Sequence, residues 1–175
     1  MLRDELDRLT DDPDVDCHPK LLAELSEHHS HNIRIIEWAT HTQMYTCFMH
    51  AFGLREQPEY IRVATSGSGK IFANSLFVSF LLQRGYLQER TAGTVCPDGV
   101  VIYFAAGVPQ HAGITKGKER IESKWGSGHL YEHGALEVPA KYGDEVKYYS
   151  SISKDMALKH FLEYANDNLQ TGGAG

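Results

Sequence analysis

The chain has 175 residues, of which 42% are hydrophobic and 23% are charged, a composition typical of one globular domain with a core that needs no disulfide framework. Its formal net charge is −6, and no stretch is rich in lysine and arginine. This balance argues against nucleic acid and against anionic membrane surfaces as partners.

Export signals and cysteine spacing bear on the compartment. The first residues, MLRDELDRLTDDPDVD, are acidic and lack the basic start and apolar centre of a signal peptide. The longest apolar run, LFVSFLL, is too short to cross a bilayer. The three cysteines (Cys17, Cys47 and Cys96) are scattered and odd in number, which does not suit a disulfide framework. We therefore expect a cytoplasmic protein, and delivery by a machine that needs no cleaved signal stays open.

Helical patterns come first along the chain. Residues 1–30 predict a helical lead-in, since Pro19 opens a second helix and leucines recur on one face of the first (Leu2, Leu6 and Leu9). The stretch NIRIIEWATHTQ has no clear period. Residues 46–53 predict a short buried helix with Cys47 in its first turn, EQPEYIRVATSGSGK predicts a loop, and IFANSLFVSFLLQRGY predicts the clearest helix.

Strand patterns follow. YLQERTA, GVVIYFAAG, QHAGITKG, RIESKWG and DEVKYYSSI are short β-like runs separated by turn residues. A last helix is predicted over 153–168, with Ser153 as its N-cap. Helices followed by a meander of strands predict an α+β fold, a helix packed on an antiparallel sheet, and not a parallel doubly wound sheet. We expect one domain over residues 1–175, with its core at 40–150.

Two stretches resemble binding motifs but lack residues that the binding chemistry requires. A phosphate loop is suggested by ATSGSGK, but Ala64 stands where the first glycine belongs and Ile71 where the magnesium-binding hydroxyl belongs. The histidines of HHSHN lack a cysteine pair or an HExxH helix at zinc spacing. We therefore expect no cofactor and no metal.

Cys47 and His111 carry the candidate chemistry. Taken alone, a free cysteine is most often packed in a core. Here Cys47 opens a helix, while His111 opens a strand and is followed by the small residues Ala112 and Gly113, which let another element approach its ring. A helix N-terminus and an imidazolium both lower a thiol pKa from its usual value of about 8.5. The pattern predicts Cys47 as nucleophile and His111 as general base.

This order resembles that of papain-like cysteine peptidases. A cysteine at a helix start, a strand reading HAGI and a neighbouring strand with a polar group are most similar to the compact NlpC-type branch, including uncharacterised bacterial members with HAxI, SK(L/W)G and a later H and YG. The likeness covers roughly residues 40–150. It implies a papain-like fold and reaction through an acyl-enzyme.

The resemblance also implies the remaining site residues. The third catalytic residue falls in ESKWG, at Ser123, with Glu122 and His133 as alternatives. A side-chain amide upstream of the cysteine, Gln43, is implied as the second oxyanion donor. The chain departs from the branch at the nucleophile, where Asp-Cys-Ser-Gly is replaced by Thr-Cys-Phe-Met. This change implies a bulkier and more apolar entrance to the active site, and it leaves open whether the substrate is peptidoglycan.

The expected function is thiol-dependent amide hydrolysis of a peptide or protein. Deamidation and acyl transfer stay open, because the same pair serves all three and the acceptor alone decides between them. The alternative is a catalytically inactive papain-like scaffold that binds a protein partner. A bacterial effector toxin with a cognate partner or inhibitor would be a setting for the enzyme, not a rival mechanism.

Overall fold

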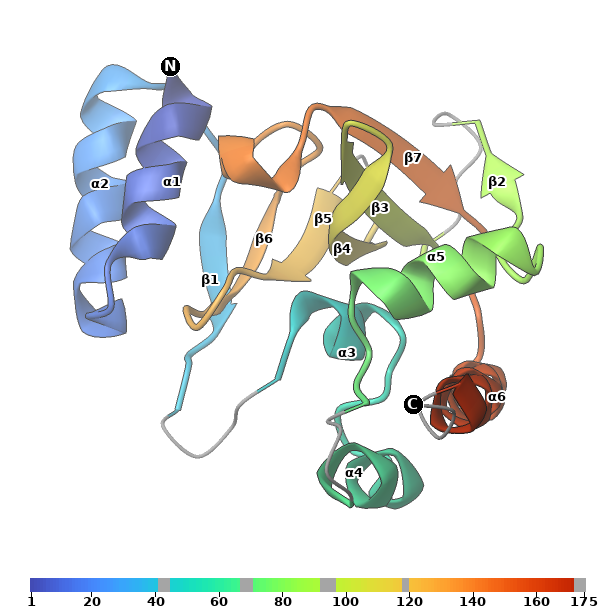
Figure 1. Cartoon of the computed structure of the whole chain (residues 1–175). Coiled ribbons are helices and arrows are strands. Elements are labelled where there is room, and N and C mark those ends of the chain that lie inside the picture. Colours follow the sequence, from blue (N-terminus) through green and yellow to red (C-terminus); the bar gives the residue numbers. More distant parts are fainter. Residues whose placement is uncertain (41–44, 67–70, 92–96, 118–119, 172–175) are drawn as a thin grey trace.

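The computed structural model describes residues 1–40, 45–66, 71–91, 97–117 and 120–171 (Figure 1). Within these ranges the protein is an α+β domain with six α-helices and a seven-stranded sheet in which every paired strand is antiparallel. The strand order across the sheet is β1-β6-β5-β4-β3-β7-β2. The predicted α+β class, with its helical lead-in and C-terminal helix, is confirmed.

The helices are α1 (Leu2–Asp11), α2 (His18–His28), α3 (Cys47–Ala51), α4 (Pro58–Thr65), α5 (Ser75–Gln83) and α6 (Lys154–Thr171), with the 3₁₀ turns η1 (Val15–Cys17) and η3 (Ala140–Tyr142). The strands are β1 (Arg34–Glu37), β2 (Glu89–Arg90), β3 (Val100–Ala105), β4 (Val108–Thr115), β5 (Arg120–Lys124), β6 (Leu130–Gly134) and β7 (Glu145–Tyr149). The Ser153 hydroxyl accepts a hydrogen bond from the Met156 amide at 3.2 Å, as expected of an N-cap.

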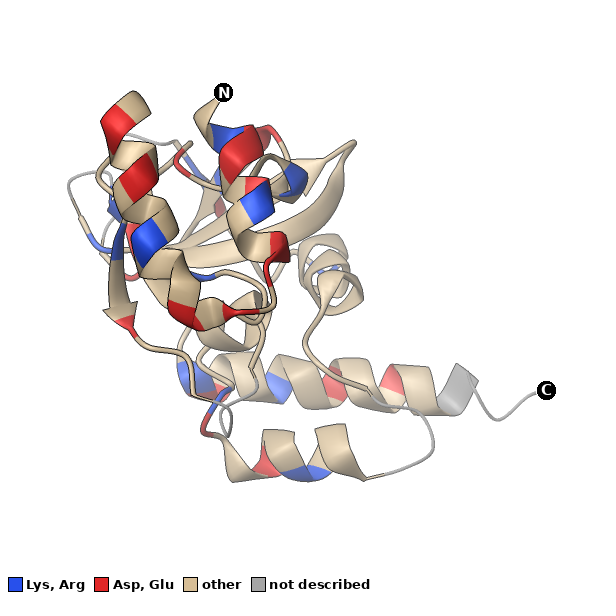
Figure 2. Ribbon diagram, turned by 90° about the vertical axis from the view of Figure 1, so that its left-hand side faces the viewer, with Lys and Arg blue, Asp and Glu red and all other residues tan. Residues whose placement is uncertain are grey.

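The loop predicted for EQPEYIRVATSGSGK is wrong over Pro58–Thr65, which forms α4. Pro58 suits the first turn of a helix, where its missing N–H costs nothing. Tyr60 then anchors the helix, with its ring 4.5 Å from that of Phe161 on α6. Figure 2 shows α4 and α6 lying side by side. The glycine–serine run at 67–70 lies outside the described residues.

Both faces of the sheet are covered, which explains the continuous apolar run of β3. Its alternate residues Val100, Ile102 and Phe104 join a core cluster with α3, α5 and α6. Val101 and Tyr103 point the other way, into a cluster with leucines of α1 and α2. A strand buried on both faces loses the alternation that marks a half-exposed one. Figure 1 shows α1 and α2 on one side of the sheet and α3, α5 and α6 on the other.

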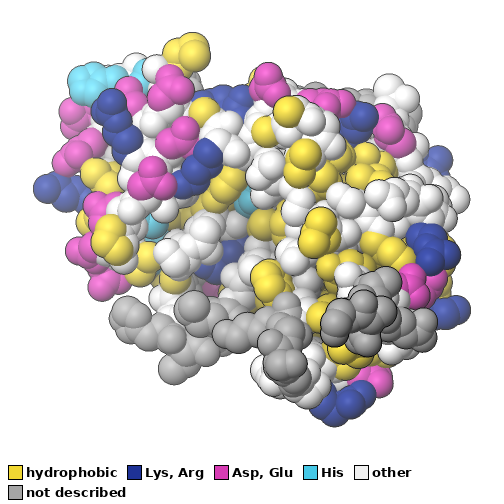
Figure 3. Space-filling view, viewed as in Figure 1, with side chains coloured by type: hydrophobic (Ala, Val, Ile, Leu, Met, Phe, Trp, Pro, Cys, Tyr) yellow, Lys and Arg dark blue, Asp and Glu magenta, His cyan; other side chains and the backbone are white. Residues whose placement is uncertain are grey.

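The lead-in helices also have a solvated face. Figure 2 shows Lys, Arg, Asp and Glu interspersed along α1 and α2. In Figure 3 the same side of the molecule carries charged side chains of both signs, whereas hydrophobic side chains are more frequent over the other half. This mixture is typical of a surface helix that buries only one stripe.

The pairing of β4 with β5 is short. The two strands pair at Ile114 with Glu122 and at Thr115 with Ile121. Gly113, the residue before this pairing, still lies close to Glu122 and Ser123 of β5. Helix α3 contacts both strands, and this arrangement positions the site.

Candidate active site

Cys47 is the first residue of α3, as the sequence predicts. The Thr46 side chain caps the helix by accepting a hydrogen bond from the Met49 amide at 3.2 Å. Phe48 and Ala51 bury the opposite face of this single turn in the core. The capped start and the buried face together fix the position of the Cys47 sulfur.

The electrostatics of the thiol differ from the sequence expectation. Burial raises the pKa of the Cys47 thiol to about 11, although the backbone amides of Ala112 and Phe48 favour its charged form. The helix is only five residues long, so its dipole is small, and the loss of hydration decides the direction. The expected lowering of the pKa is therefore not found, and the thiol is neutral at pH 7.

The Ala112 amide lies beside the thiol. The Thr115 amide donates to the Gly99 carbonyl on the β3 side, so by strand alternation the Ala112 amide points to the β5 side of β4. There it is close enough to the Cys47 sulfur to favour the thiolate.

His111 lies on β4 opposite Tyr103, and the strand begins at Val108 and not, as predicted, at His111. Only 1% of the surface of His111 is exposed. Its ring stacks on that of Tyr142, with centroids 3.9 Å apart and planes at 4°. The Nε2 atom is buried and has no hydrogen-bond partner among the described residues. Burial, and then the nearby His133 and His50, hold the pKa of His111 well below its usual value, so the ring is neutral.

One pocket of about 480 Å³ brings these side chains together. Cys47 and His111 both line it, with Thr40, Tyr45, Thr46, Met49, Gln110, Lys124, Gly126, Ser127 and Tyr142. Within the described part of the chain, no hydrogen bond joins the Cys47 sulfur to the His111 ring. The resting site is thus a neutral thiol and a neutral imidazole on the wall of one pocket.

Ser123 is buried, but its hydroxyl is committed elsewhere. His133 donates from Nδ1 to the Gly134 carbonyl at 2.8 Å, so its Nε2 must accept from Ser123 Oγ, 2.7 Å away. Trp125 donates its Nε1–H to the same oxygen at 3.0 Å. The structure therefore gives Ser123 a place in a core network and does not bring its hydroxyl to His111.

The two alternatives for the third residue have partners of their own. The Glu122 carboxylate lies 3.0 Å from His50 Nε2 and 3.6 Å from Lys116 Nζ. His133 is tied into the Ser123 network, and burial lowers its pKa to about 4. The ring of His133 is close enough to depress the pKa of His111. Gln43, the implied oxyanion donor, lies outside the described residues.

The pocket also contains two residues that sequence reasoning missed, Lys124 and Tyr142. Lys124 is 3% exposed, and its Nζ donates to the Gly126 carbonyl at 3.1 Å and to the Gly128 carbonyl. Burial lowers its pKa to about 8. Lysine is almost always solvated, so SKWG gave no reason to place this side chain inside. The sequence feature that could have pointed to Tyr142 is the YG pair, which served above only as part of the resemblance to NlpC-type peptidases.

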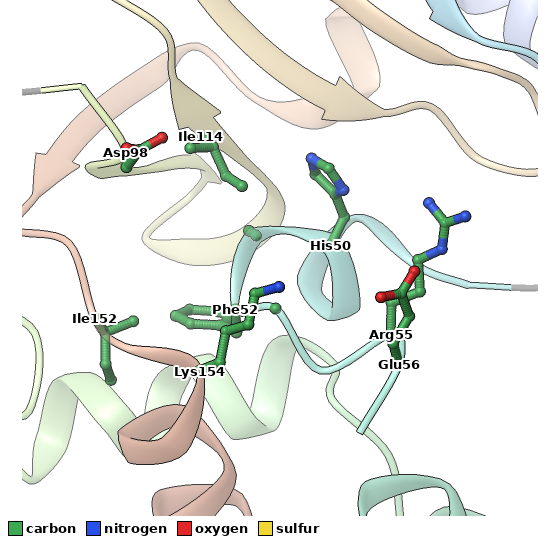
Figure 4. Close-up of a pocket in the computed structure, with 10 residues that line it drawn as sticks. His50, Phe52, Arg55, Glu56, Asp98, Ile114, Ile152 and Lys154 are labelled. Carbon is green, nitrogen blue, oxygen red and sulfur yellow. The ribbon is translucent and has the colours of Figure 1, made fainter. Parts of the chain in front are cut away.

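A second pocket of about 330 Å³ lies at the C-terminal end of α3 (Figure 4). Arg55 and Lys154 line it together with Glu56 and Asp98. The Lys154 stem packs so closely on Gly53 that an added Cβ would lie 2.6 Å from its Cγ. Among the described residues, no cysteine, serine or threonine lines this pocket, so these residues offer no hydroxyl or thiol nucleophile there. The Cys47 pocket is the better candidate for chemistry.

The described ranges contain neither a candidate metal site nor a candidate membrane span. There, no group of three or more His, Cys, Asp or Glu side chains could hold a metal ion. None of the helices described is both long and apolar enough to cross a membrane.

Comparison with protein families matches residues 37–150 to a domain of unknown function (DUF7689). The match covers more than half of the chain. The chain belongs to this family. The DUF7689 segment includes Cys47, His111 and Tyr142 and leaves α1, α2 and α6 outside. Comparisons with curated proteins and with solved structures find no match.

The lead-in lies outside the DUF7689 segment and yet supports the pocket. Arg3 on α1 donates from Nε to the Val138 carbonyl at 3.1 Å, and from Nη2 to the carbonyls of Pro139 and Gly143. These contacts hold both ends of η3, the turn that carries Tyr142. The lead-in is therefore part of what positions the site.

Proposed function

We propose that this DUF7689 domain is a thiol-dependent amide hydrolase with a papain-like arrangement of the NlpC type. The supporting observation is that Cys47 and His111 line one pocket and that the buried Nε2 of His111 has no hydrogen-bond partner among the described residues. Buried ring nitrogens without a partner are rare, and they need an explanation where they occur. A thiol proton delivered to Nε2 supplies one.

The first step is attack by Cys47 on an amide carbonyl. The S–H proton passes to His111 Nε2 as the S–C bond forms, and the carbonyl electron pair moves onto oxygen. When the tetrahedral intermediate collapses, the C–N bond breaks and the imidazolium gives its proton to the leaving amine. The products of this step are a thioester on Cys47 and a neutral His111.

Water completes the reaction. His111 takes a proton from water as the oxygen attacks the thioester, and the C–S bond breaks to release the acid. The proton then returns from the imidazolium to the thiolate. An ammonia-releasing glutamine or an amine acceptor would use the same steps, so deamidation and acyl transfer differ only in the amine that leaves or enters.

Burial of the pair decides the protonation states. A neutral thiol and a neutral imidazole require the proton to move during attack, rather than a preformed thiolate–imidazolium pair. Activity should therefore depend on His111 as a base at every pH below the thiol pKa. We infer a peptide or protein amide as substrate, and a cytoplasmic or effector setting stays a prediction.

The partial burial and raised pKa of Cys47 favour a second candidate, an inactive papain-like scaffold that binds a protein partner. A partly buried thiol with a raised pKa is ordinary for structural cysteine. The scaffold requires no transfer of an acyl group to Cys47 and no dependence of its reactivity on His111. This difference can be tested without a known substrate.

The test is single-turnover acylation by p-nitrophenyl acetate. The enzyme should release one p-nitrophenolate per chain in a burst, and peptide mass spectrometry should find the acetyl group on Cys47. Cys47→Ser should abolish the burst, and His111→Gln should slow it by about 100-fold or more, the loss usual for a general base. Thermal unfolding of each variant checks the fold. Absence of acetylation on Cys47, or acetylation unaffected by His111→Gln, would favour the scaffold.

A further inference from the structure

The Tyr142 hydroxyl is a second buried polar atom without a partner in the same pocket. Tyr142 is 9% exposed, and its oxygen makes no hydrogen bond within the described ranges. The backbone amide of Gly126 lies near enough to favour the phenolate, but outside hydrogen-bond geometry. Two residues that line one cavity with Cys47 thus each carry a buried polar atom without a partner among the described residues, the Tyr142 hydroxyl and His111 Nε2. A ligand that can bond to both would explain them together.

The phenol is held in place on three sides. Its ring stacks face to face on His111. The 3₁₀ turn that carries it is tied to α1 through Arg3. The next residue, Gly143, presses against the backbone of Phe104 on β3. A group fixed in this way loses little entropy when it binds a reacting atom.

We propose that Tyr142 is a further catalytic residue that donates its O–H to the oxyanion formed when Cys47 attacks an amide carbonyl. The proposal rests on the proposed function. As the S–C bond forms, the carbonyl electron pair moves onto oxygen, and this oxygen accepts the hydrogen bond. The proton stays on Tyr142 throughout, and the bond weakens again when the carbonyl reforms.

The chemistry of the phenol suits this role. Burial raises the pKa of Tyr142 well above its usual value, and the nearby Cys47 acts in the same direction, so the phenol remains a donor. Donors aimed at developing charge in a site shielded from water are worth more than in solution. The resemblance implies Gln43 for this task, and Tyr142 would supply a donor from among the described residues that line the pocket.

Two reactions of the same thiol separate this role from a structural one. Acylation by p-nitrophenyl acetate passes through an oxyanion, whereas alkylation by iodoacetamide is a direct displacement that forms none. Tyr142→Phe keeps the ring stack and removes only the hydroxyl. It should lower the acylation rate constant of Cys47 by about 100-fold, as the loss of an oxyanion donor does, and leave alkylation unchanged.

Tyr103→Phe is the matched control. The Tyr103 ring also contacts that of His111, at 5.6 Å between centroids, but its hydroxyl donates to the Ala135 carbonyl, and Tyr103 is not among the described residues that line the pocket. This variant should not change the ratio of acylation to alkylation. Thermal unfolding of both variants reports their stability.

Each outcome decides one of the two proposals. If Tyr142→Phe leaves acylation at the native rate, or slows acylation and alkylation equally, Tyr142 is not an oxyanion donor. The catalytic pair would stand in both cases, provided that native acylation depends on His111. If the native protein is not acylated on Cys47, or His111→Gln has no effect, the proposed function itself fails, and the role of Tyr142 with it.

Discussion

The rings of His111 and Tyr142 stack face to face, with their centroids 3.9 Å apart and their planes 4° apart. This contact joins His111 on β4, the base of the proposed mechanism, to a phenol on η3, which follows it in the chain by the whole length of β5 and β6. A stacked ring cannot turn freely, so in the proposed mechanism the stack would orient the imidazole, the task of a hydrogen-bonding third residue in a catalytic triad. The neighbouring Ser123–His133 pair is committed to the core.

Alkylation of Cys47 should have an unusually alkaline pH profile. Burial disfavours the thiolate and raises the thiol pKa to about 11, so the rate with iodoacetamide should still be rising at pH 10. The variant Cys17→Ser/Cys96→Ser leaves Cys47 as the one thiol to be measured. Free glutathione under the same conditions serves as the reference. A plateau at neutral pH would mean that the thiolate is already formed at that pH. The inference of a neutral Cys47 thiol beside a neutral His111 imidazole would then be wrong.

Removing the Ser123 hydroxyl should affect stability and not reactivity. Ser123→Ala leaves His133 Nε2 and Trp125 Nε1 without their partner in the core, at a cost of about 1–3 kcal/mol in the free energy of unfolding. Urea unfolding measures this cost. Ser66→Ala, which removes an exposed hydroxyl, should change little.

The rate of Cys47 acylation in Ser123→Ala shows whether Ser123 belongs only to the core network with His133 and Trp125 or also orients His111 as a third catalytic residue. It should be unchanged in Ser123→Ala under conditions where the variant is folded. A large loss of acylation at native stability would show that Ser123 orients His111, as the resemblance implies.

The strongest periodic signals were sufficient to predict most of the fold. The one-turn helix at Cys47 follows from an N-cap threonine and an apolar face, and the long apolar helix at α5 is capped by Asn74. The prediction of a loop at α4 failed because the stability of this helix comes from Tyr60 packing on α6. Local helix propensity does not include such a contact. Strand β6 was missed because its partners β1 and β5 decide its pairing.

Within the site, the sequence could predict residue types in order but not their surroundings. Cys47 and His111 do reach one pocket. Their neutral charge states depend on burial by elements distant in sequence, and so does the inward position of Lys124. Tyr142 could not be predicted as a pocket residue, because Arg3 and Gly143 place its turn through contacts across the chain.

Acid should destabilise the protein between pH 6.5 and about 4. Burial lowers the pKa of His133 to about 4 in the folded state, while an unfolded histidine titrates near 6.5. In this window the unfolded chain binds one more proton at this residue, so stability falls as the pH falls, by about 3 kcal/mol for His133 alone. Urea unfolding at several pH values measures the slope.

His133→Gln isolates this contribution. A glutamine amide can still accept from Ser123, but it does not titrate. The variant should be less stable at pH 7 and should lose stability less steeply toward pH 4, with the remaining slope coming from other buried histidines such as His111. An unchanged slope would mean that His133 is already charged in the folded protein.

Gly143→Ala should be the most damaging substitution of a glycine near the site. The residue has φ +104°, and an added Cβ would lie 2.1 Å from the Phe104 carbonyl oxygen, which belongs to backbone and cannot move aside. Gly107→Ala is the matched control, because its φ is +76° and nothing lies within 4 Å of the added atom. The control should therefore cost only the strain of a left-handed alanine, about 1–2 kcal/mol, whereas the clash in Gly143→Ala should add about 1–3 kcal/mol more. Thermal and urea unfolding of the two variants give this difference. Because Gly143 follows Tyr142, a folded Gly143→Ala protein should also lose acylation of Cys47, and equal stability of the two variants would show that η3 does not lie against β3.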